Sequence, residues 1–133
     1  MLKKNMTTLR IALAQVNPAL GDLKGNVEKI ISNIDKAKSY GAHIIVFPEL
    51  SVTGSPPNDL LFCESFLNET DEETKRVIPH TRGIVAIFGS VHRRDGSLFN
   101  CACIIAGGRE VHRYYKRSLR EWPHLNERRY FNS

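Results

Sequence analysis

The chain has 133 residues, of which 41% are hydrophobic and 25% are charged, and its 19 lysines and arginines outnumber 14 aspartates and glutamates. This ordinary globular composition excludes collagen-like, low-complexity and disordered classes. The length suits one domain with its own core, and no apolar run approaches the roughly 20 residues that cross a bilayer. Residues 1–8 contain no apolar stretch that could serve as a signal peptide, so we predict a soluble, cytoplasmic protein without a membrane partner.

The cysteines do not form a recognisable framework. Cys63, Cys101 and Cys103 are too few and too unevenly spaced for a secreted disulfide scaffold, which favours reduced thiols. A C-x-C pair alone supplies only part of the set of four ligands that zinc takes in structural sites. We therefore expect no metal site.

The basic residues concentrate near the end of the chain, in 109–133, and the formal net charge is +5. Acidic residues interrupt this run, and no helix-turn-helix, zinc-finger or RNA-binding motif accompanies it. Such runs are usually solvated faces, so we do not expect a nucleic-acid partner.

The sequence of the first half of the chain predicts a strand, a helix and a second strand. Residues 9–16 alternate apolar and polar positions and are followed by a loop, which indicates a strand. Residues 24–40 carry an apolar stripe at helical spacing, and Gly41 is a natural stop. The almost wholly apolar run 43–47 is typical of a strand that is covered on both faces. These elements form a βαβ unit of a parallel sheet, which places the fold in the α/β class.

The second half is richer in strands than in helices. We predict a helix from 58 to about 67, capped by Asn58, and a short helix over 71–78 that ends before Pro79. Strands follow over 84–89, 98–105 and 110–116. The turns between them are Asp95-Gly96 and Gly107-Gly108.

Glu49 is the first candidate functional residue. It comes directly after the buried strand 43–47, and functional groups in parallel sheets gather at the carboxyl ends of the strands. From position alone, a residue that only caps or solvates the strand end remains an alternative.

Several short motifs occur in a fixed order. They are Ile11-Ala12-Leu13-Ala14-Gln15, Asn17-Pro18 with Gly21-Asp22 and Asn26, Val46-Phe47-Pro48-Glu49-Leu50, and Thr53-Gly54 before Pro56-Pro57-Asn58-Asp59-Leu60-Leu61. Together they resemble the start of the nitrilase, or carbon-nitrogen hydrolase, superfamily, and most nearly the amino-terminal glutaminase domain of glutamine-dependent NAD synthetases. The resemblance predicts a partial glutaminase-like domain over 9–133, preceded by a polar extension over 1–8.

The resemblance assigns roles to three charged residues. Glu49 matches the glutamate that acts as general base, and Lys116, in Tyr-Tyr-Lys-Arg, matches the lysine that supports the tetrahedral intermediate. Glu127 matches a second glutamate that positions the lysine and the substrate. Because this chemistry takes place around one carbon, we expect the side chains of Glu49 and Lys116 to meet within hydrogen-bond or one-water distance.

The nucleophilic cysteine of the family lies beyond the position of Arg129-Tyr130-Phe131, and this sequence ends at Ser133. We therefore expect no nucleophile in this chain and no activity of the chain alone. Ser55 replaces an aromatic residue that helps to wall the family's substrate pocket, and residues 120–126 lack the family's usual turn residues. Decay or truncation of the gene product is the expected explanation.

The fold implied by the resemblance is a four-layer α-β-β-α sandwich, of which this chain supplies the first half. An isolated half should expose apolar surface and a sheet edge. The implied activity is hydrolysis of glutamine to glutamate and ammonia for NAD synthesis, in an oligomer. The domain itself needs no cofactor, whereas a synthetase domain or complementary chain uses ATP and magnesium. Alternatives are an amidase for other small amides and a non-catalytic fragment that only binds partners.

Overall fold

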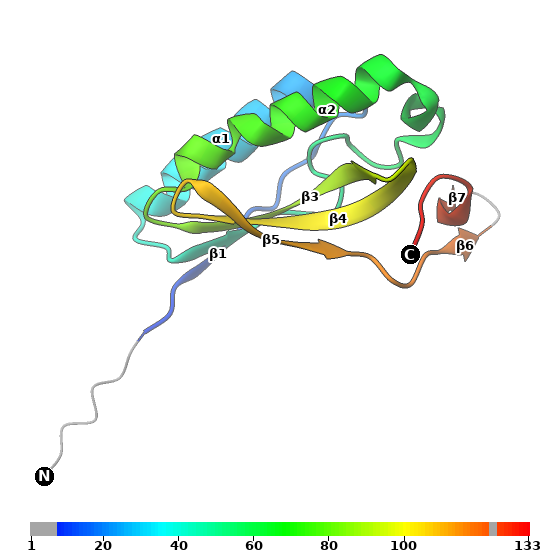
Figure 1. The fold of residues 1–133 in the computed structure, drawn as a ribbon. Coiled ribbons are helices and arrows are strands. Elements are labelled where there is room, and N and C mark those ends of the chain that lie inside the picture. Colours follow the sequence, from blue (N-terminus) through cyan, green and yellow to red (C-terminus); the bar gives the residue numbers. More distant parts are fainter. Residues whose placement is uncertain (1–7, 123–124) are drawn as a thin grey trace, which may run out of the picture.

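A five-stranded mixed sheet carries both α-helices on one face (Figure 1). The computed structural model describes residues 8–122 and 125–133. The strands are β1 (Ile11–Leu13), β2 (Ile44–Val46), β3 (Val85–Arg94), β4 (Ser97–Ala106), β5 (Arg109–Tyr115), β6 (Glu121–Trp122) and β7 (Leu125–Asn126). The α-helices are α1 (Leu23–Ser39) and α2 (Glu64–Arg76), and the 3-10 helices are η1 (Asn58–Phe62), η2 (Ile78–Thr81) and η3 (Glu127–Arg129).

The sheet has the order β1-β2-β3-β4-β5, with the first three strands parallel and the last two antiparallel to their neighbours. Strands β6 and β7 form a separate two-stranded hairpin. The α/β class expected from the sequence is confirmed. No helix within the described residues is long and apolar enough to span a membrane.

The βαβ unit forms as its hydrophobic pattern predicts. The Asp22 carboxylate accepts a 3.0 Å hydrogen bond from the Gly25 N–H and so caps α1. Gly41, at φ 69°, ends the helix in the left-handed region. The apolar stripe of α1 packs on the sheet, where Ile45 of β2 is 2% exposed. Both strands are shorter than predicted, at three residues each.

The predicted bounds of the two helices within residues 58–78 were wrong. Asn58 does not cap a helix but is the first residue of η1, at φ 45°, and the chain becomes extended at Cys63. The true α-helix, α2, starts there and runs without a break through 68–71. It is continuous because Leu67, Thr70 and Thr74 recur at helical spacing on its buried side.

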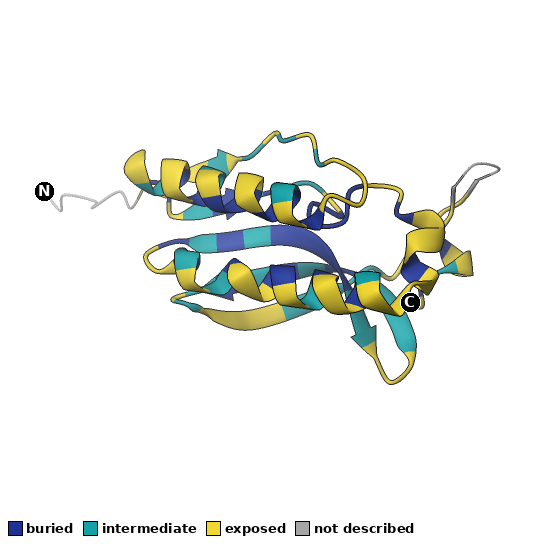
Figure 2. Cartoon of the chain, turned by 90° about the horizontal axis from the view of Figure 1, so that it is seen from above, coloured by how far each residue is buried: buried dark blue, intermediate teal, exposed yellow. Residues whose placement is uncertain are grey.

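Strands β3 and β4 form a hairpin of ten residues on each side, which extends well beyond the predicted strand 84–89. Its turn is the predicted Asp95-Gly96 pair, with both residues at positive φ. The hairpin places Phe88, Cys103 and Ile105 in the core beneath the helices. Seen from the helix side, the exposed residues of α1 and α2 face outward (Figure 2).

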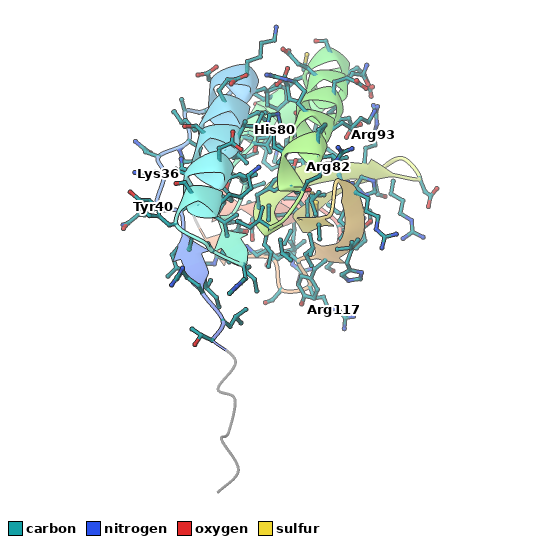
Figure 3. The ribbon with its side chains drawn as sticks, turned by 90° about the vertical axis from the view of Figure 1, so that its left-hand side faces the viewer. Lys36, Tyr40, His80, Arg82, Arg93 and Arg117 are labelled. Atoms are coloured by element: carbon teal, nitrogen blue, oxygen red, sulfur yellow. The ribbon has the colours of Figure 1, made fainter. Side chains whose placement is uncertain are left out.

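No helix formed by residues 8–122 or 125–133 covers the second face of the sheet (Figure 1). Arg117 lies on that side of the molecule, away from α1 and α2 (Figure 3). Several large apolar side chains are exposed there or at the β1 edge, including Ile11 at 50%, Leu13 at 79% and Tyr114 at 53%. This chain thus holds one helical layer and one sheet layer of the expected sandwich, and the prediction of exposed apolar surface is confirmed.

Candidate active site

Glu49 lies at the carboxyl end of β2, in a loop whose backbone packs directly against Gly89 of β3. The Val52 N–H donates to the Gly89 carbonyl at 3.2 Å. A Cβ atom on Gly89 would lie 2.2 Å from the Leu50 nitrogen, so only glycine lets this loop approach. Leu50 itself adopts a left-handed φ of 52°. The Glu49 side chain is therefore directed from a rigid loop at the strand end, where the sequence predicted it.

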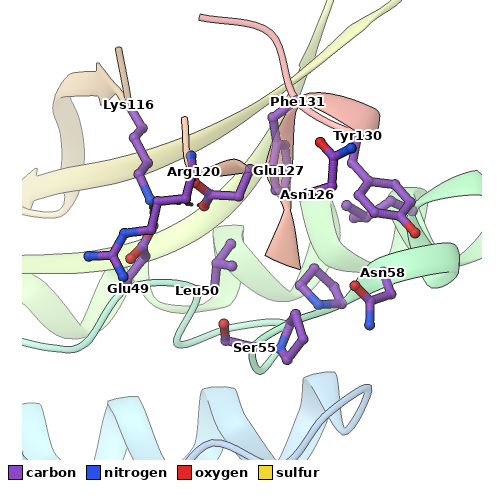
Figure 4. Close-up of a pocket in the computed structure, with 13 residues that line it drawn as sticks. Glu49, Leu50, Ser55, Asn58, Lys116, Arg120, Asn126, Glu127, Tyr130 and Phe131 are labelled. Carbon is purple, nitrogen blue, oxygen red and sulfur yellow. Dashed lines mark hydrogen bonds and ion pairs between the residues drawn. The ribbon is translucent and has the colours of Figure 1, made fainter. Parts of the chain in front are cut away.

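Lys116 reaches the same point from the end of β5. Its backbone N–H donates to the Asn100 carbonyl of β4 at 2.9 Å, which continues the sheet by one residue. Its Nζ lies 2.8 Å from Oε1 of Glu49 and 2.8 Å from Oε1 of Glu127 (Figure 4). The expected meeting of Glu49 and Lys116 is confirmed, although they lie 67 positions apart.

Glu127 is the buried member of this group, with a residue exposure of 6%. It begins η3, and Asn126 caps that turn by accepting from the Arg129 N–H at 3.2 Å. Oε2 of Glu127 accepts from the Arg120 backbone N–H at 2.7 Å. Both carboxylate oxygens therefore have donors, which offsets the cost of burying the charge.

The shared contacts shift two pKa values in opposite directions. Burial disfavours the charged form of Glu127, but hydrogen bonds from Lys116 and from the Arg120 backbone outweigh it and lower its pKa. Burial likewise disfavours the Lys116 ammonium, but its hydrogen bonds to Glu127 and Glu49 raise its pKa. These shifts favour the charged forms of Lys116 and Glu127 at neutral pH.

A fourth residue, Asn100, was missed in the sequence analysis. It is 3% exposed, and its Nδ2 donates to Oε1 of Glu49 at 2.6 Å and toward Oε1 of Glu127 at 3.5 Å. The only available signal was a polar residue in the otherwise apolar strand 98–105, on the opposite face from Cys101 and Cys103. That signal does not identify a partner.

These charged groups line a pocket. Ser55 lies in its wall together with Glu49, Lys116 and Glu127. The remaining lining residues are Leu50, Pro56, Pro57, Asn58, Leu61, Arg120, Asn126, Tyr130 and Phe131. Glu49 and Lys116 also border a second, more open groove that runs along the helix-free face of the sheet.

None of the three cysteines lines the pocket that holds Glu49, Lys116 and Glu127. Cys63 is exposed at the start of α2, and a hydrogen bond with Ser65 lowers the pKa of its thiol. Cys101 and Cys103 are buried beneath the helices. The hydrogen bond with Cys103 and burial raise the pKa of Cys101, which makes it a poor nucleophile.

No group of three or more histidine, cysteine or acidic side chains that could hold a metal ion occurs in 8–122 and 125–133. Within the described residues, the pocket presents the ammonium group of Lys116 between the acidic side chains of Glu49 and Glu127. This set of groups can take up a proton and stabilise a developing oxyanion.

Comparison with known proteins decides the family. Residues 10–133 match the carbon-nitrogen hydrolase family. The chain belongs to this family. Among curated carbon-nitrogen hydrolase relatives, the glutamine-dependent NAD(+) synthetase of Thermotoga maritima is 38% identical over 128 residues, covering 95% of this chain and 22% of that protein. The enzyme of the same name from Aquifex aeolicus is 40% identical over 126 residues, covering 92% of this chain and 22% of that protein.

Solved structures agree with this membership of the carbon-nitrogen hydrolases. A glutamine-dependent NAD(+) synthetase from Cytophaga hutchinsonii superposes with a TM-score of 0.90 at 28% identity, over 96% of this chain and 22% of that one. An amidase from Nesterenkonia has a TM-score of 0.77 at 23% identity, over 86% of this chain and 44% of that one, and shows the shared fold. The chain spans less than a quarter of the length of the synthetase relatives it matches.

Proposed function

We propose that Glu49, Lys116 and Glu127 are the acid-base and charge-stabilising part of a glutaminase site, which splits glutamine into glutamate and ammonia for NAD synthesis. One observation carries the proposal: Nζ of Lys116 lies 2.8 Å from a carboxylate oxygen of both Glu49 and Glu127. The identity to glutamine-dependent NAD(+) synthetases supports glutamine as the amide.

The chemistry needs a thiol in addition to these groups. Glu49 takes the proton of the thiol, and the thiolate sulfur forms a bond to the amide carbon while the carbonyl electron pair moves onto oxygen. The Lys116 ammonium stabilises that oxyanion. When the intermediate collapses, the C–N bond breaks and the Glu49 proton leaves with ammonia, which leaves a thioester. Water then attacks the thioester carbon and gives a proton to Glu49. The C–S bond breaks, the leaving sulfur takes that proton from Glu49 to restore the thiol, and glutamate is released.

We infer that none of the three cysteines supplies this thiol. Cys63 lies outside the pocket, and Cys101 and Cys103 are buried on the helix side of the sheet. A chain with these cysteines alone should therefore not turn over glutamine. The nucleophile would come from protein that covers the pocket, and the ATP and magnesium of NAD synthesis belong to a synthetase domain, with no cofactor at this site.

A different small amide is the second candidate. Ser55 lines the pocket where the family's aromatic residue is expected, so this wall is smaller and more polar. A smaller wall residue leaves room for a bulkier amide.

The proposal can be tested in a chimera. This chain would replace the matching 128 residues of the Thermotoga maritima synthetase, and NAD formation would be measured with glutamine or with ammonia as nitrogen source. We expect activity with both. Glu49→Gln and Lys116→Met should reduce the glutamine reaction by about a hundredfold or more, because each removes a group that acts in the transition state.

The ammonia reaction is the control for folding of the chimera. Lys24→Met is the matched control variant, since the contact of Lys24 with Glu69 is exposed and 3.7 Å long, and its loss should leave both reactions unchanged. A chimera that uses ammonia but never glutamine would contradict the proposal. Ammonia release by the 133-residue chain that is lost in Cys63→Ser would contradict the inference about the nucleophile.

A further inference from the structure

We propose that Asn100 is a positioning residue that fixes the carboxylate of Glu49, so that Oε1 is held toward Lys116 and Oε2 is left for proton transfer. This inference rests on the proposed role of Glu49 as the base. It adds to that role the choice between the two oxygens of the carboxylate.

The contacts of Glu49 are one-sided. The hydrogen bonds that described residues make to its side chain come from Lys116 at 2.8 Å and Asn100 at 2.6 Å, and both end on Oε1. The Glu49 side chain is 52% exposed, so it lies partly in solvent. Two donors on one oxygen set the rotation of the carboxylate and direct Oε2 away from both donors.

Asn100 can act in this way because it is itself immobile. It is 3% exposed in the centre of the β3–β4 hairpin, where it pairs with Val91. Its carbonyl accepts the Lys116 backbone N–H at 2.9 Å. One residue therefore fixes the base through its side chain and the lysine through its main chain.

The groups that face the Asn100 amide come from three directions. Glu49 follows β2, Lys116 follows β5, and Glu127 begins η3. Oε1 of Glu127 lies 3.5 Å from Nδ2 of Asn100, and Arg120 lines the wall of the same pocket. A neutral amide suits this place, because it donates to two carboxylates without adding a second positive charge beside Lys116. An aspartate would place a third carboxylate there, and a leucine would leave Oε1 with one donor.

The test uses NMR of the 133-residue chain, and a second buried amide serves as internal control. Asn26 is 1% exposed, but its Nδ2 donates to the carbonyls of Ala19 at 2.7 Å and Val52 at 3.0 Å, which do not titrate. A hydrogen bond to a carboxylate is stronger than one to a carbonyl and moves the amide proton downfield.

We expect one Asn100 side-chain proton to lie downfield, to move upfield as the carboxylates are protonated, and to move upfield also in Glu49→Gln. The Asn26 protons should stay in place throughout. Glu127→Gln should affect the other Asn100 proton, and less strongly, because that contact is longer. If the chemical shifts of the Asn100 side-chain protons change neither in Glu49→Gln nor in acid, the proposal is overturned.

A second measurement addresses positioning directly. In Asn100→Leu, the NMR order parameter of the Glu49 side chain should fall toward that of an exposed glutamate such as Glu69, while the Asn26 signals report an intact fold. An unchanged order parameter would overturn the proposal. The wild-type and Glu49→Gln spectra decide the contact even if Asn100→Leu does not fold. Failure of the chimera to use glutamine would count against the proposed function and not against the Asn100 contact.

Discussion

The phenol of Tyr130 donates a 2.6 Å hydrogen bond to Oδ1 of Asp59, which lies 71 positions earlier in the chain. The same aspartate lies 3.5 Å from the Arg129 guanidinium, and the Tyr130 ring contacts the Phe62 ring at a centroid distance of 5.3 Å. These contacts join η1 to the end of η3. Because Glu127 starts η3, they also fix the buried carboxylate of the site.

Removing this hydrogen bond should loosen the segment that carries Glu127. In Tyr130→Phe the ring contact with Phe62 is retained, so we expect faster amide hydrogen exchange in 126–131 without loss of the fold. Tyr40→Phe, at an exposed position at the end of α1, is the matched control and should not change exchange there. Equal exchange in wild type and Tyr130→Phe would show that the phenol does not hold η3 in place.

The stability that Glu127 provides should depend on pH in a predictable direction. Because the folded state lowers its pKa, its contribution is complete above the unfolded value of about 4.3 and is lost as the pH falls through the lower folded value. Glu127→Gln should therefore reduce the free energy of unfolding by about 1–3 kcal/mol at neutral pH, and the difference should disappear in acid.

Urea denaturation between neutral and acidic pH measures this difference. Glu69→Gln is the control, because the 3.7 Å contact of Glu69 with Lys24 is exposed and should contribute less than about 1 kcal/mol. A difference between wild type and Glu127→Gln that grows in acid would contradict the assigned direction.

Gly89→Ala should disturb the loop that carries Glu49. The added Cβ would meet the Leu50 nitrogen at 2.2 Å, and main-chain atoms cannot move aside without displacing the loop. We expect a loss of about 1–3 kcal/mol of unfolding free energy, as for overpacked sites, and shifted NMR signals at Glu49 and Leu50. Gly96→Ala also strains a positive φ but meets no atom within 4 Å, so it should destabilise without moving the Glu49 signals.

The βαβ unit should exchange its amide protons more slowly than the end of the chain. Ile45 lies in the core between β1 and β3, whereas the β6–β7 hairpin has only two residues on each side. We therefore predict stronger protection in 43–47 than in 119–126, of which 123–124 lie outside the described residues. Similar protection in both segments would indicate that the hairpin is part of the stable core.

The sequence predicted correctly those elements whose signal lies within the element's own residues. The stripe of α1, the buried run at β2 and the Asp95-Gly96 turn each had one dominant signal, and the structure confirms all three. Helix α2 was divided wrongly because Asn58 and the polar residues 68–71 look like ends in sequence. Its continuity depends on residues that are buried only once the helix packs on the sheet.

The same limit applies to the site, because contacts between residues far apart in the sequence cannot be derived from local patterns. Glu49 was first singled out by its position after a buried strand, whereas Lys116, Glu127 and Ser55 were found through the family resemblance. All four line one pocket, and their roles remain predictions. Asn100 was not part of the motifs that carry the resemblance. The role of an asparagine in a strand can be inferred only when its neighbours across the sheet are known.

Nζ of Lys116 is shared between two acidic side chains of the pocket, Glu49 and Glu127. In the proposed reaction, a proton that arrives on Glu49 would remove one of the two anions that share Lys116. The ammonium would then be compensated by Glu127 alone, at the moment when a new negative charge forms on the substrate oxygen. Sharing one lysine between two carboxylates would thus link the strength of the oxyanion partner to the position of the proton.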